Sequence, residues 1–265
     1  MAHSLLHSLF VFILGTVVGS FLNVCIYRLP REESVIWPAS KCPHCAHPIR
    51  WFDNVPILSF FILRGRCRDC QGEISVRYAT IETLTGIIFL WVSVFFGWTA
   101  HGVVALILFC SLLVASVVDL EHQIIPDEIS FGGLAVGLIL SSVFPEIYQE
   151  AIWWKGLIQA LIGALLGGGM IYVTGMIGDF VFKKESMGGG DVKLLAMLGA
   201  FLGWKNAILI FLLAPILALP LGLFLKFARR VHVISYGPFL SLAGWISFVW
   251  GDKIIQWYLY GMRFY

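Results

Sequence analysis

Long apolar stretches separated by short polar segments run along the chain from residue 5 to residue 260. Most of them are long enough, or nearly long enough, to cross the hydrocarbon layer of a membrane as an α-helix, which takes about 20 residues. The glycine-rich segment GALLGGGM, 163–170, lies inside one stretch and is expected to be a close-packing helix face. The pattern predicts about eight helices: 5–27, 79–96, 103–118, 129–144, 156–181, 192–203, 207–226 and 238–260.

The composition indicates the class of protein. Of the 265 residues, 59% are hydrophobic and 13% are charged, whereas about a quarter of the residues of a soluble domain carry a charge. We therefore expect an all-α polytopic membrane protein. Residues 1–7 contain no lysine or arginine, and no small-residue cleavage site follows the first apolar stretch. That stretch is therefore expected to be a retained helix rather than a signal peptide.

The basic residues predict the orientation in the membrane. If the N-terminus lies outside, only four of the 18 basic residues lie outside, which leaves 14 for the inside loops that the positive-inside rule favours. The loops 28–78, 119–128, 182–191 and 227–237 are then cytoplasmic, and both termini lie outside. The net charge is only +2, and no basic stripe is interleaved with aromatic residues, so we expect no nucleic-acid partner. The four outside residues are Lys155, Lys205, Lys253 and Arg263.

The loop 28–78 is the one polar segment large enough for a soluble domain, so the chain is expected to divide into 1–27, 28–78 and 79–265. The loop carries two C-x2-C pairs, CPHC and CRDC, with 21 residues between them. Such pairs supply four thiolates to one tetrahedral zinc ion, which would stabilise a loop too small to form its own core. Disulfides are the alternative, which a reducing cytoplasm disfavours. The predicted ligands are Cys42, Cys45, Cys67 and Cys70, with His44 and His47 as nearby competitors.

Two aspartates lie at the ends of predicted helices in the segment VVDLEHQIIPDEIS, 117–130. Asp127 precedes an apolar stretch, where a carboxylate caps the first turn of a helix, and capping is its expected main role. Asp119 ends a helix, where unpaired carbonyl groups oppose a negative charge and no capping role is expected. An acidic residue at this membrane depth indicates a functional site.

A third aspartate, Asp191, follows a run of glycines and opens the apolar stretch 192–203. Asp191 could cap that helix, but a cap does not need three glycines before it. A run of glycines lets another backbone come close, so these glycines are expected beside a peptide substrate. Asp119 and Asp191 are both expected at the cytoplasmic face. The glycines are Gly188, Gly189 and Gly190.

Five sequence blocks, in order along the chain, resemble the type IV prepilin leader peptidases. They are GSFLNVCIYRLP at 19–30, the paired C-x2-C segments, DLEHQIIPD at 119–127, GGGD at 188–191 and YGPFLSLAGW at 236–245. GGGD matches the GxGD motif of this family of intramembrane aspartyl proteases. The blocks span nearly the whole chain, and together they are far more specific than any one of them.

The resemblance implies a bifunctional enzyme of the bacterial inner membrane. Such enzymes cut the basic leader from type IV prepilins, or from the pseudopilins of type II secretion, at the cytoplasmic face. They then methylate the new N-terminal amine with S-adenosylmethionine. The family's two catalytic aspartates match Asp119 and Asp191, although some relatives have a further aspartate where this chain has Glu121. Methylation is associated with the cysteine-bearing loop, which points to RGRC, 64–67, with Gly65 and Arg66 as contacts for the cofactor or the substrate. The alternative is that this segment only forms the turn into the second cysteine pair.

Hydrolysis of a peptide bond by two carboxyl groups needs one ionised, to activate water, and one protonated, to act as the acid. From the dipoles of their own helices, Asp191 is expected to be the base and Asp119 the acid. A proton- or cation-coupled transporter could use the same acids together with Glu82, and a scaffold anchored by its zinc domain is a third hypothesis. Because the acids gather at one face and no internal repeat is present, the sequence favours the peptidase.

Overall fold

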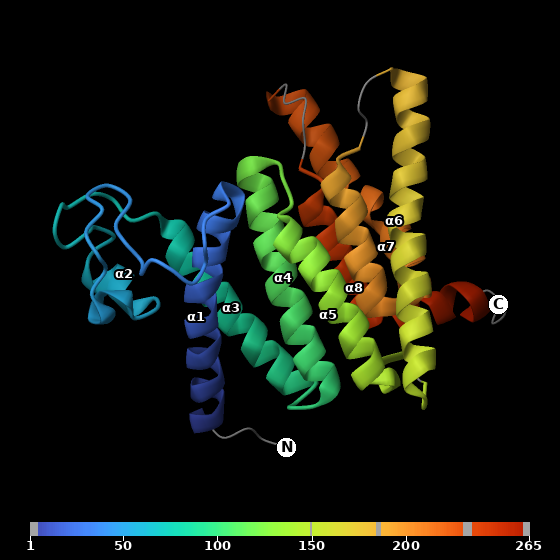
Figure 1. Cartoon of the computed structure of the whole chain (residues 1–265), viewed down its shortest axis with the longest axis horizontal. Helices are drawn as coiled ribbons and strands as arrows, with labels where there is room; N and C mark the ends of the chain where they lie inside the picture. The colour runs from blue at the N-terminus through green and yellow to red at the C-terminus, as the bar shows by residue number, and fades with distance from the viewer. Residues whose placement is uncertain (1–4, 149, 184–186, 230–234, 262–265) are drawn as a thin grey trace. The chain divides into compact units, whose positions relative to one another are not determined.

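Every regular element of the described chain is a helix (Figure 1). The structure is a computed structural model, and it describes residues 5–148, 150–183, 187–229 and 235–261. Within these residues, β-structure is limited to two isolated bridges. The α-helices and the short 3-10 helices (η) are α1 (Leu5–Arg28), η1 (Leu29–Arg31), η2 (Trp51–Asn54), α2 (Leu58–Ile62), α3 (Val76–Phe95), α4 (Ala100–His122), α5 (Asp127–Val143), η3 (Pro145–Tyr148), α6 (Trp153–Phe182), α7 (Gly189–Arg229) and α8 (Gly237–Tyr260).

Five helical segments of the described chain are long and apolar enough to cross a membrane. They indicate a multi-pass membrane protein, as the composition predicted. α5 has 17 residues, slightly fewer than the roughly 20 that a straight crossing takes. The all-helical fold is confirmed, while the count of eight membrane helices stays a prediction. The five segments are Leu5–Arg31, Val76–Phe95, Ala100–His122, Trp153–Phe182 and Gly189–Phe224.

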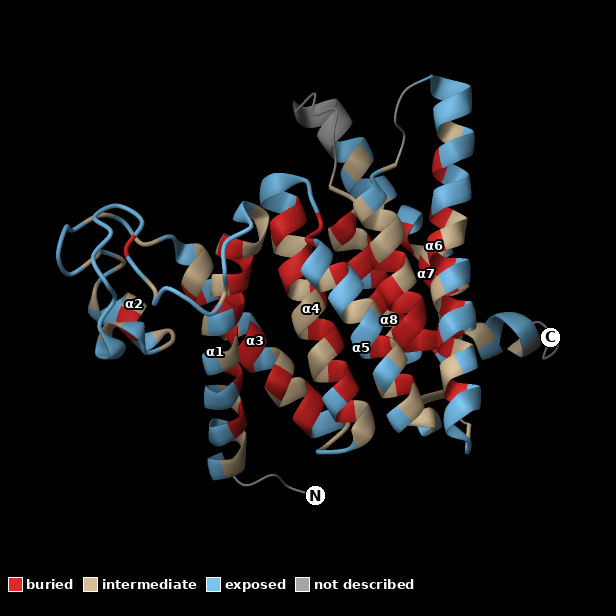
Figure 2. Cartoon of the chain, in the orientation of Figure 1, coloured by how far each residue is buried: buried red, intermediate tan, exposed pale blue. Residues whose placement is uncertain are grey.

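The chain divides into two compact units, Met1–Cys110 and Ser111–Tyr265. The first contains both cysteine pairs, and the second contains both aspartates expected to be catalytic. In each unit, buried residues lie on the helix faces that meet other helices, while many apolar side chains on the remaining faces are exposed (Figure 2). Helices that are apolar on all sides are typical of membrane segments. The predicted three-part division, with its boundary at residue 79, stays a prediction.

Three buried polar side chains tie the parts of the first unit together. On α1, the Asn23 amide donates a 3.0 Å hydrogen bond to the carbonyl of Tyr78 in α3. The Glu82 carboxylate of α3 accepts a 2.7 Å hydrogen bond from the N–H of Ile57, in the cysteine-bearing loop. The Arg28 guanidinium donates to two further carbonyls of that loop, at 2.8 and 2.7 Å. Glu82 therefore has a structural partner, which accounts for its position without a role in ion transport.

In the second unit, α7 packs against α5, α6 and α8. The α7 side chains of Leu195 and Leu198 are fully buried. The closest approach is between α6 and α7, where a side chain at either Gly163 or Gly199 would collide with the backbone of the other helix. The close-packing face expected at 163–170 is therefore confirmed.

α7 is interrupted at Gly203, where the backbone leaves the helical conformation with φ 77° and ψ 172°. Residues other than glycine rarely adopt a positive φ of this kind, so the break depends on glycine. It falls at the point where the sequence separates the apolar stretches 192–203 and 207–226. The two predicted helices are therefore both present, joined end to end across a kink.

Side chains near the kink supply donors to the carbonyl groups around it. The hydroxyl of Tyr148 donates to the carbonyl of Ala200. The Asn206 amide donates to the carbonyl of Leu202 at 3.0 Å, and the oxygen of the same amide accepts a 2.9 Å hydrogen bond from Ser247 of α8. A break in a helix leaves carbonyl groups without their usual N–H donors, and the membrane interior has no water to replace them. Donors from side chains are therefore needed at the kink.

Candidate active site and metal cluster

Three chain segments meet at one end of the second unit: the loop between α4 and α5, the start of α7 and the start of α8. The ammonium of Lys193 in α7 contacts the carboxylate of Asp127 in α5 at 2.6 Å. Ile125, in the loop, packs against Gly190. The first residue of α8 contacts the last turn of α4. The polar segments that carry the predicted catalytic aspartates are therefore neighbours.

Asp119 lies in the last turn of α4, with 6% of its surface exposed. Its carboxylate oxygen Oδ2 accepts a 2.8 Å hydrogen bond from the N–H of Gly237, the first residue of α8. Its main-chain carbonyl accepts hydrogen bonds from the N–H of Gln123 and the hydroxyl of Ser235, both at 2.9 Å. The expectation that no capping role exists for Asp119 is therefore wrong, because another part of the chain brings a helix N-terminus to it.

Asp191 is the third residue of α7, and its N–H donates to the carbonyl of Gly188 at 3.1 Å. Asp191 is therefore inside the first turn and is not the cap. Its carboxyl group is close enough to Asp119 for their charges to interact. Burial, and to a smaller extent the charge of Asp191, raise the pKa of the Tyr236 phenol to about 12. The two predicted catalytic carboxyl groups are thus neighbours, with a neutral phenol nearby.

The three glycines before Asp191 differ in their surroundings. A Cβ on Gly190 would lie 3.1 Å from the Cβ of Ile125, so Gly190 is needed for packing inside the protein. Gly188 and Gly189 are exposed, and a Cβ on Gly189 would meet nothing within 4 Å. Gly188 and Gly189 are therefore the more exposed of the three, and the expected place of all three glycines beside a substrate stays a prediction.

The other polar residues of the α4–α5 segment point outward. Asp127 begins α5, but its side chain does not cap the helix, whose N-cap position is occupied by Pro126. The Asp127 carboxylate is 60% exposed and pairs with Lys193 instead, so the capping prediction is wrong. Glu121 and His122 are exposed. Asp119 is the one carboxyl group of this segment that is directed into the protein.

Sequence reasoning did not identify Gly237 or Ser235 as partners of Asp119. The signal was present, because a glycine followed by Pro238 opens the predicted helix 238–260, and proline in the first turn is typical of a helix N-terminus. A helix N-terminus attracts a carboxylate. The carboxylate that it attracts is 118 residues away in the sequence, which no local pattern indicates.

The four predicted metal ligands lie together in the first unit. The sulfurs of Cys42, Cys45, Cys67 and Cys70 all lie within 4.8 Å of one another, and the cluster includes neither His44 nor His47. Tetrahedral zinc, with zinc–sulfur bonds of about 2.3 Å, places its sulfurs roughly 3.8 Å apart. The Cys42 and Cys70 sulfurs are 3.9 Å apart, too far for a disulfide. The described cysteines are all free, and this cluster could hold a metal ion.

The two cysteine pairs have the same backbone geometry. The N–H of Cys42 donates to the carbonyl of His47 at 2.9 Å, and the N–H of Cys67 donates to the carbonyl of Gly72 at 2.8 Å. Each pair is followed by a residue with positive φ, 57° at Ala46 and 60° at Gln71. An isolated antiparallel bridge flanks each pair. Two equivalent turns therefore direct two sulfurs each toward a common point.

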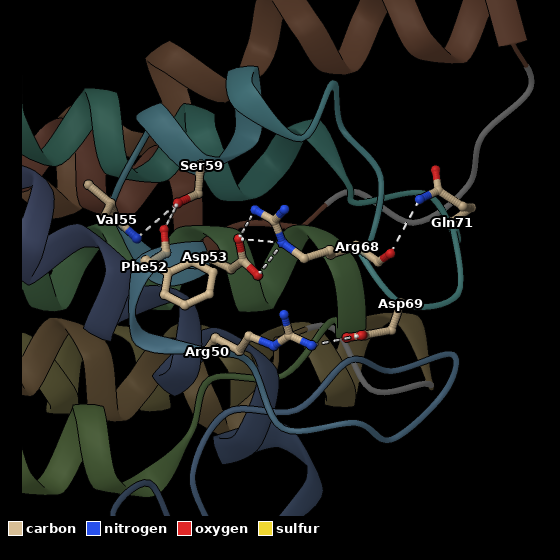
Figure 3. A network of polar contacts seen from close by, with 8 residues as sticks. All are labelled: Arg50, Phe52, Asp53, Val55, Ser59, Arg68, Asp69 and Gln71. Atoms are coloured by element: carbon tan, nitrogen blue, oxygen red, sulfur yellow. Dashed lines mark hydrogen bonds and ion pairs between the residues drawn. The ribbon is translucent and has the colours of Figure 1, made fainter.

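Ion pairs attach the second cysteine pair to η2, as Figure 3 shows. The guanidinium of Arg68 donates to both carboxylate oxygens of Asp53, with its shortest contact at 2.6 Å. Arg50 pairs with Asp69 at 3.4 Å. The hydrogen bonds from Arg68 lower the pKa of Asp53. Both residues between Cys67 and Cys70 are thus used to hold the loop in place.

The clustered thiols affect one another's protonation. Burial raises the pKa of Cys42, but the N–H groups of Cys45 and His44 outweigh burial and bring that pKa down to about 7. The N–H of His47 lowers the pKa of Cys45, but desolvation and the neighbouring sulfurs of Cys70 and Cys42 outweigh it and raise that pKa to about 12. Four thiolates this close would repel each other, and a bound divalent cation would remove that repulsion.

Gly65 and Arg66, the residues expected to contact the methyl donor, form the turn into the second cysteine pair. Gly65 has φ 67°, and its carbonyl accepts a 2.7 Å hydrogen bond from the N–H of Ile74. Arg66 takes part in the bridge with Glu73, and it is exposed. The turn accounts for Gly65, while the Arg66 side chain is open to a ligand.

Comparison with known proteins agrees with this arrangement. The model of the bacterial peptidase A24 N-terminal domain matches residues 13–96, and the model of the type IV leader peptidase family matches residues 106–223. No solved structure matches the chain.

Three curated relatives match over nearly their whole length. A prepilin leader peptidase/N-methyltransferase of Stutzerimonas stutzeri is 36% identical over 93% of this chain and 92% of its own. Proteins of the same name from Aeromonas hydrophila and Pseudomonas aeruginosa are 36% and 34% identical, over 98% and 97% of this chain and 97% and 95% of their own. With both family models in order along the sequence, the chain belongs to the type IV leader peptidase family.

Proposed function

We propose that this protein cuts the basic leader from type IV prepilins or pseudopilins with Asp119 and Asp191, and then methylates the new N-terminal amine with S-adenosylmethionine. Membership of the family, with relatives named prepilin leader peptidase/N-methyltransferase, supports both activities. The observation that carries the catalytic assignment is that two carboxyl groups from separate helices lie at one end of the second unit, where Ile125 of the α4–α5 loop packs against Gly190, the residue before Asp191, and where their charges influence each other. Among the described residues, no evidence favours the transporter or scaffold hypotheses.

The contacts of the two aspartates support roles opposite to those expected from the sequence. A hydrogen bond from a backbone N–H to a carboxylate stabilises the ionised form, and Asp119 accepts one from Gly237. We assign Asp119 as the base that takes a proton from water as its oxygen attacks the scissile carbonyl. Asp191, beside this negative charge, carries the shared proton and donates it to the carbonyl oxygen. Nearby carboxyl groups share one proton because two charges so close repel each other.

The orientation of the site follows from its place in the chain. The predicted cytoplasmic loops contain the ends of α4 and α6 and the starts of α5, α7 and α8. We infer that the protein lies in the bacterial inner membrane, with both termini in the periplasm, and that the aspartates face the cytoplasm. A basic leader is retained there by the positive-inside rule. The substrate's apolar segment would then enter the lipid bilayer beside the enzyme.

We propose that the four thiols bind one structural zinc ion. The spacing of the sulfurs and the equivalent turns around them support this assignment. When bound, zinc would hold together a loop whose other described ties are ion pairs and hydrogen bonds. The methyl donor is proposed to bind on this cytoplasmic loop, where Arg66 is exposed and could pair with its carboxylate.

The test of the peptidase is a pair of substitutions with a matched control. Asp119→Asn and Asp191→Asn should each abolish cleavage of a purified prepilin in detergent while thermal unfolding stays cooperative. Asp127→Asn changes a carboxylate at the same end of the unit that is 60% exposed, and it should keep most of the activity. Substantial cleavage by either of the first two variants would remove the proposed pair.

A further inference from the structure

The segment from Ser235 to Gly237 holds Asp119 at two points. The Ser235 hydroxyl donates to the Asp119 carbonyl at 2.9 Å, and the Gly237 N–H donates to the carboxylate oxygen Oδ2 at 2.8 Å. Between them, Tyr236 is close enough to Asp191 for its phenol to respond to that charge. Ser235 and Gly237 therefore contact Asp119 directly, and Tyr236, between them, lies within electrostatic range of Asp191.

We propose that Gly237 is a positioning residue for proteolysis: its N–H fixes Asp119 as the ionised base, and its lack of a side chain makes room for the carboxylate. This proposal rests on the proposed function of Asp119. It assigns a role to the glycine of the YGPF segment that no sequence motif or comparison provides.

The hydrogen-bond donors of the first turn of α8 show why Gly237 has this role. Pro238, the next residue, has no N–H. The N–H groups of Phe239 and Leu240 both donate to the carbonyl of Tyr236, at 3.0 and 3.1 Å. Of the first four residues of α8, Gly237 is thus the one whose N–H is directed at Asp119. The positive end of the helix dipole acts on the carboxylate through this single donor.

The position also requires glycine for steric reasons. A Cβ on Gly237 would lie 2.8 Å from Oδ2 of Asp119, 3.2 Å from its Cγ and 3.3 Å from its Cβ. The Asp119 side chain is itself buried, with 6% of the residue exposed, so it cannot swing freely into solvent to avoid the clash. Any larger residue at 237 would therefore displace the carboxylate from the N–H.

The arrangement has a consequence for the reaction. Because Oδ2 is engaged by Gly237, the second oxygen, Oδ1, is the one assigned to the attacking water. The fixed donor also keeps Asp119 ionised to lower pH than an unassisted carboxylate would be. Loss of the donor should therefore move the acidic limb of the pH profile, which a general loss of packing would not do.

The experiment compares two glycine substitutions on α8. The added Cβ of Gly237→Ala would collide with the Asp119 carboxylate. The added Cβ of Gly244→Ala, on the same helix, would instead lie 2.6 Å from Cδ2 at the flexible end of the Leu198 side chain. For each purified variant, kcat, KM and the pH dependence of kcat/KM are measured with a prepilin, together with thermal unfolding. Gly237→Ala should lower kcat at least about tenfold with little change in KM, and move the acidic limb up by about one pH unit. Gly244→Ala should leave the limb unchanged.

If Gly237→Ala folds and the acidic limb of its kcat/KM pH profile lies where it does in the parent, the proposal is overturned, whatever the loss of rate. If Gly237→Ala does not fold, Ser235→Ala decides, because it removes a contact from the same segment and adds no atoms. Ser235→Ala should lower kcat by roughly threefold to tenfold, and an unchanged kcat overturns the proposal. Failure of the proposed function looks different, because Asp119→Asn would then still cleave.

Discussion

The glycines before Asp191 allow packing and substrate access to be separated. A Cβ on Gly190 would lie 3.1 Å from the Cβ and 3.3 Å from the Cγ1 of Ile125, whereas one on Gly189 would meet nothing within 4 Å. Ile125 is 8% exposed and sits just before Pro126 in a short loop, so it has little freedom to move. Alanine at the two positions should therefore have different effects.

Overpacking a buried contact costs about 1–3 kcal/mol, and replacing glycine by alanine within a helix returns up to about 1 kcal/mol. With a cost near the middle of that range, Gly190→Ala should therefore lose about 1–2 kcal/mol of unfolding free energy. Gly189→Ala should be as stable as the parent or slightly more stable. If a substrate backbone passes along Gly189, however, Gly189→Ala should lower kcat/KM by about tenfold, and Gly189→Val by more, without any loss of stability.

The assay combines thermal unfolding in detergent with cleavage of a purified prepilin. Gly169→Ala on α6 is the control, because a Cβ there also meets nothing within 4 Å. It should match Gly189→Ala in stability while cleaving at the parent rate. Wild-type kcat/KM in both Gly189 variants would show that the open glycine is not beside the substrate. Parent stability in Gly190→Ala would refute the packing argument at Ile125.

Two further predictions concern the metal cluster and the kink in α7. Elemental analysis should find about one zinc per chain in the parent and none in Cys42→Ser. In the parent, release of zinc to a chelator should increase as the pH falls, because protons compete with the metal for the thiolates. Release that does not depend on pH would contradict the thiolate assignment. Tyr148→Phe leaves the Ala200 carbonyl without its hydroxyl donor, so it should lower thermal stability by about 1 kcal/mol and leave the pH profile of cleavage unchanged.

Much of the architecture could be predicted because it depends on local composition. The apolar stretches predicted helices, and even the break at Gly203 lies where the stretches 192–203 and 207–226 separate. The cysteine cluster was equally predictable, because a two-residue spacer determines the turn and the four sulfurs then converge. The close approach at Gly163 followed from the small residues around it.

What could not be predicted are contacts between distant residues. Asp127 looked like a helix cap, but Lys193 of another helix takes its carboxylate. Gly190 was expected beside a substrate, and the structure adds a packing contact with Ile125 from the loop between α4 and α5. In both cases the contact joins residues more than 60 positions apart, which no local pattern indicates, and the place of Gly190 beside a substrate stays a prediction.

The assignment of acid and base shows the same limit in electrostatic terms. From the sequence, each aspartate was placed in the field of its own helix, which made Asp119, at a C-terminal end, the poorer site for a charge. The field at a carboxylate, however, is set by the nearest dipoles and donors, whichever helix they belong to. The Asp119 carboxylate accepts a 2.8 Å hydrogen bond from the N–H of Gly237, at the positive end of α8. This direct hydrogen bond acts on the carboxylate at closer range than the field of the residue's own helix, which is why we propose Asp119 as the base and Asp191 as the carrier of the shared proton.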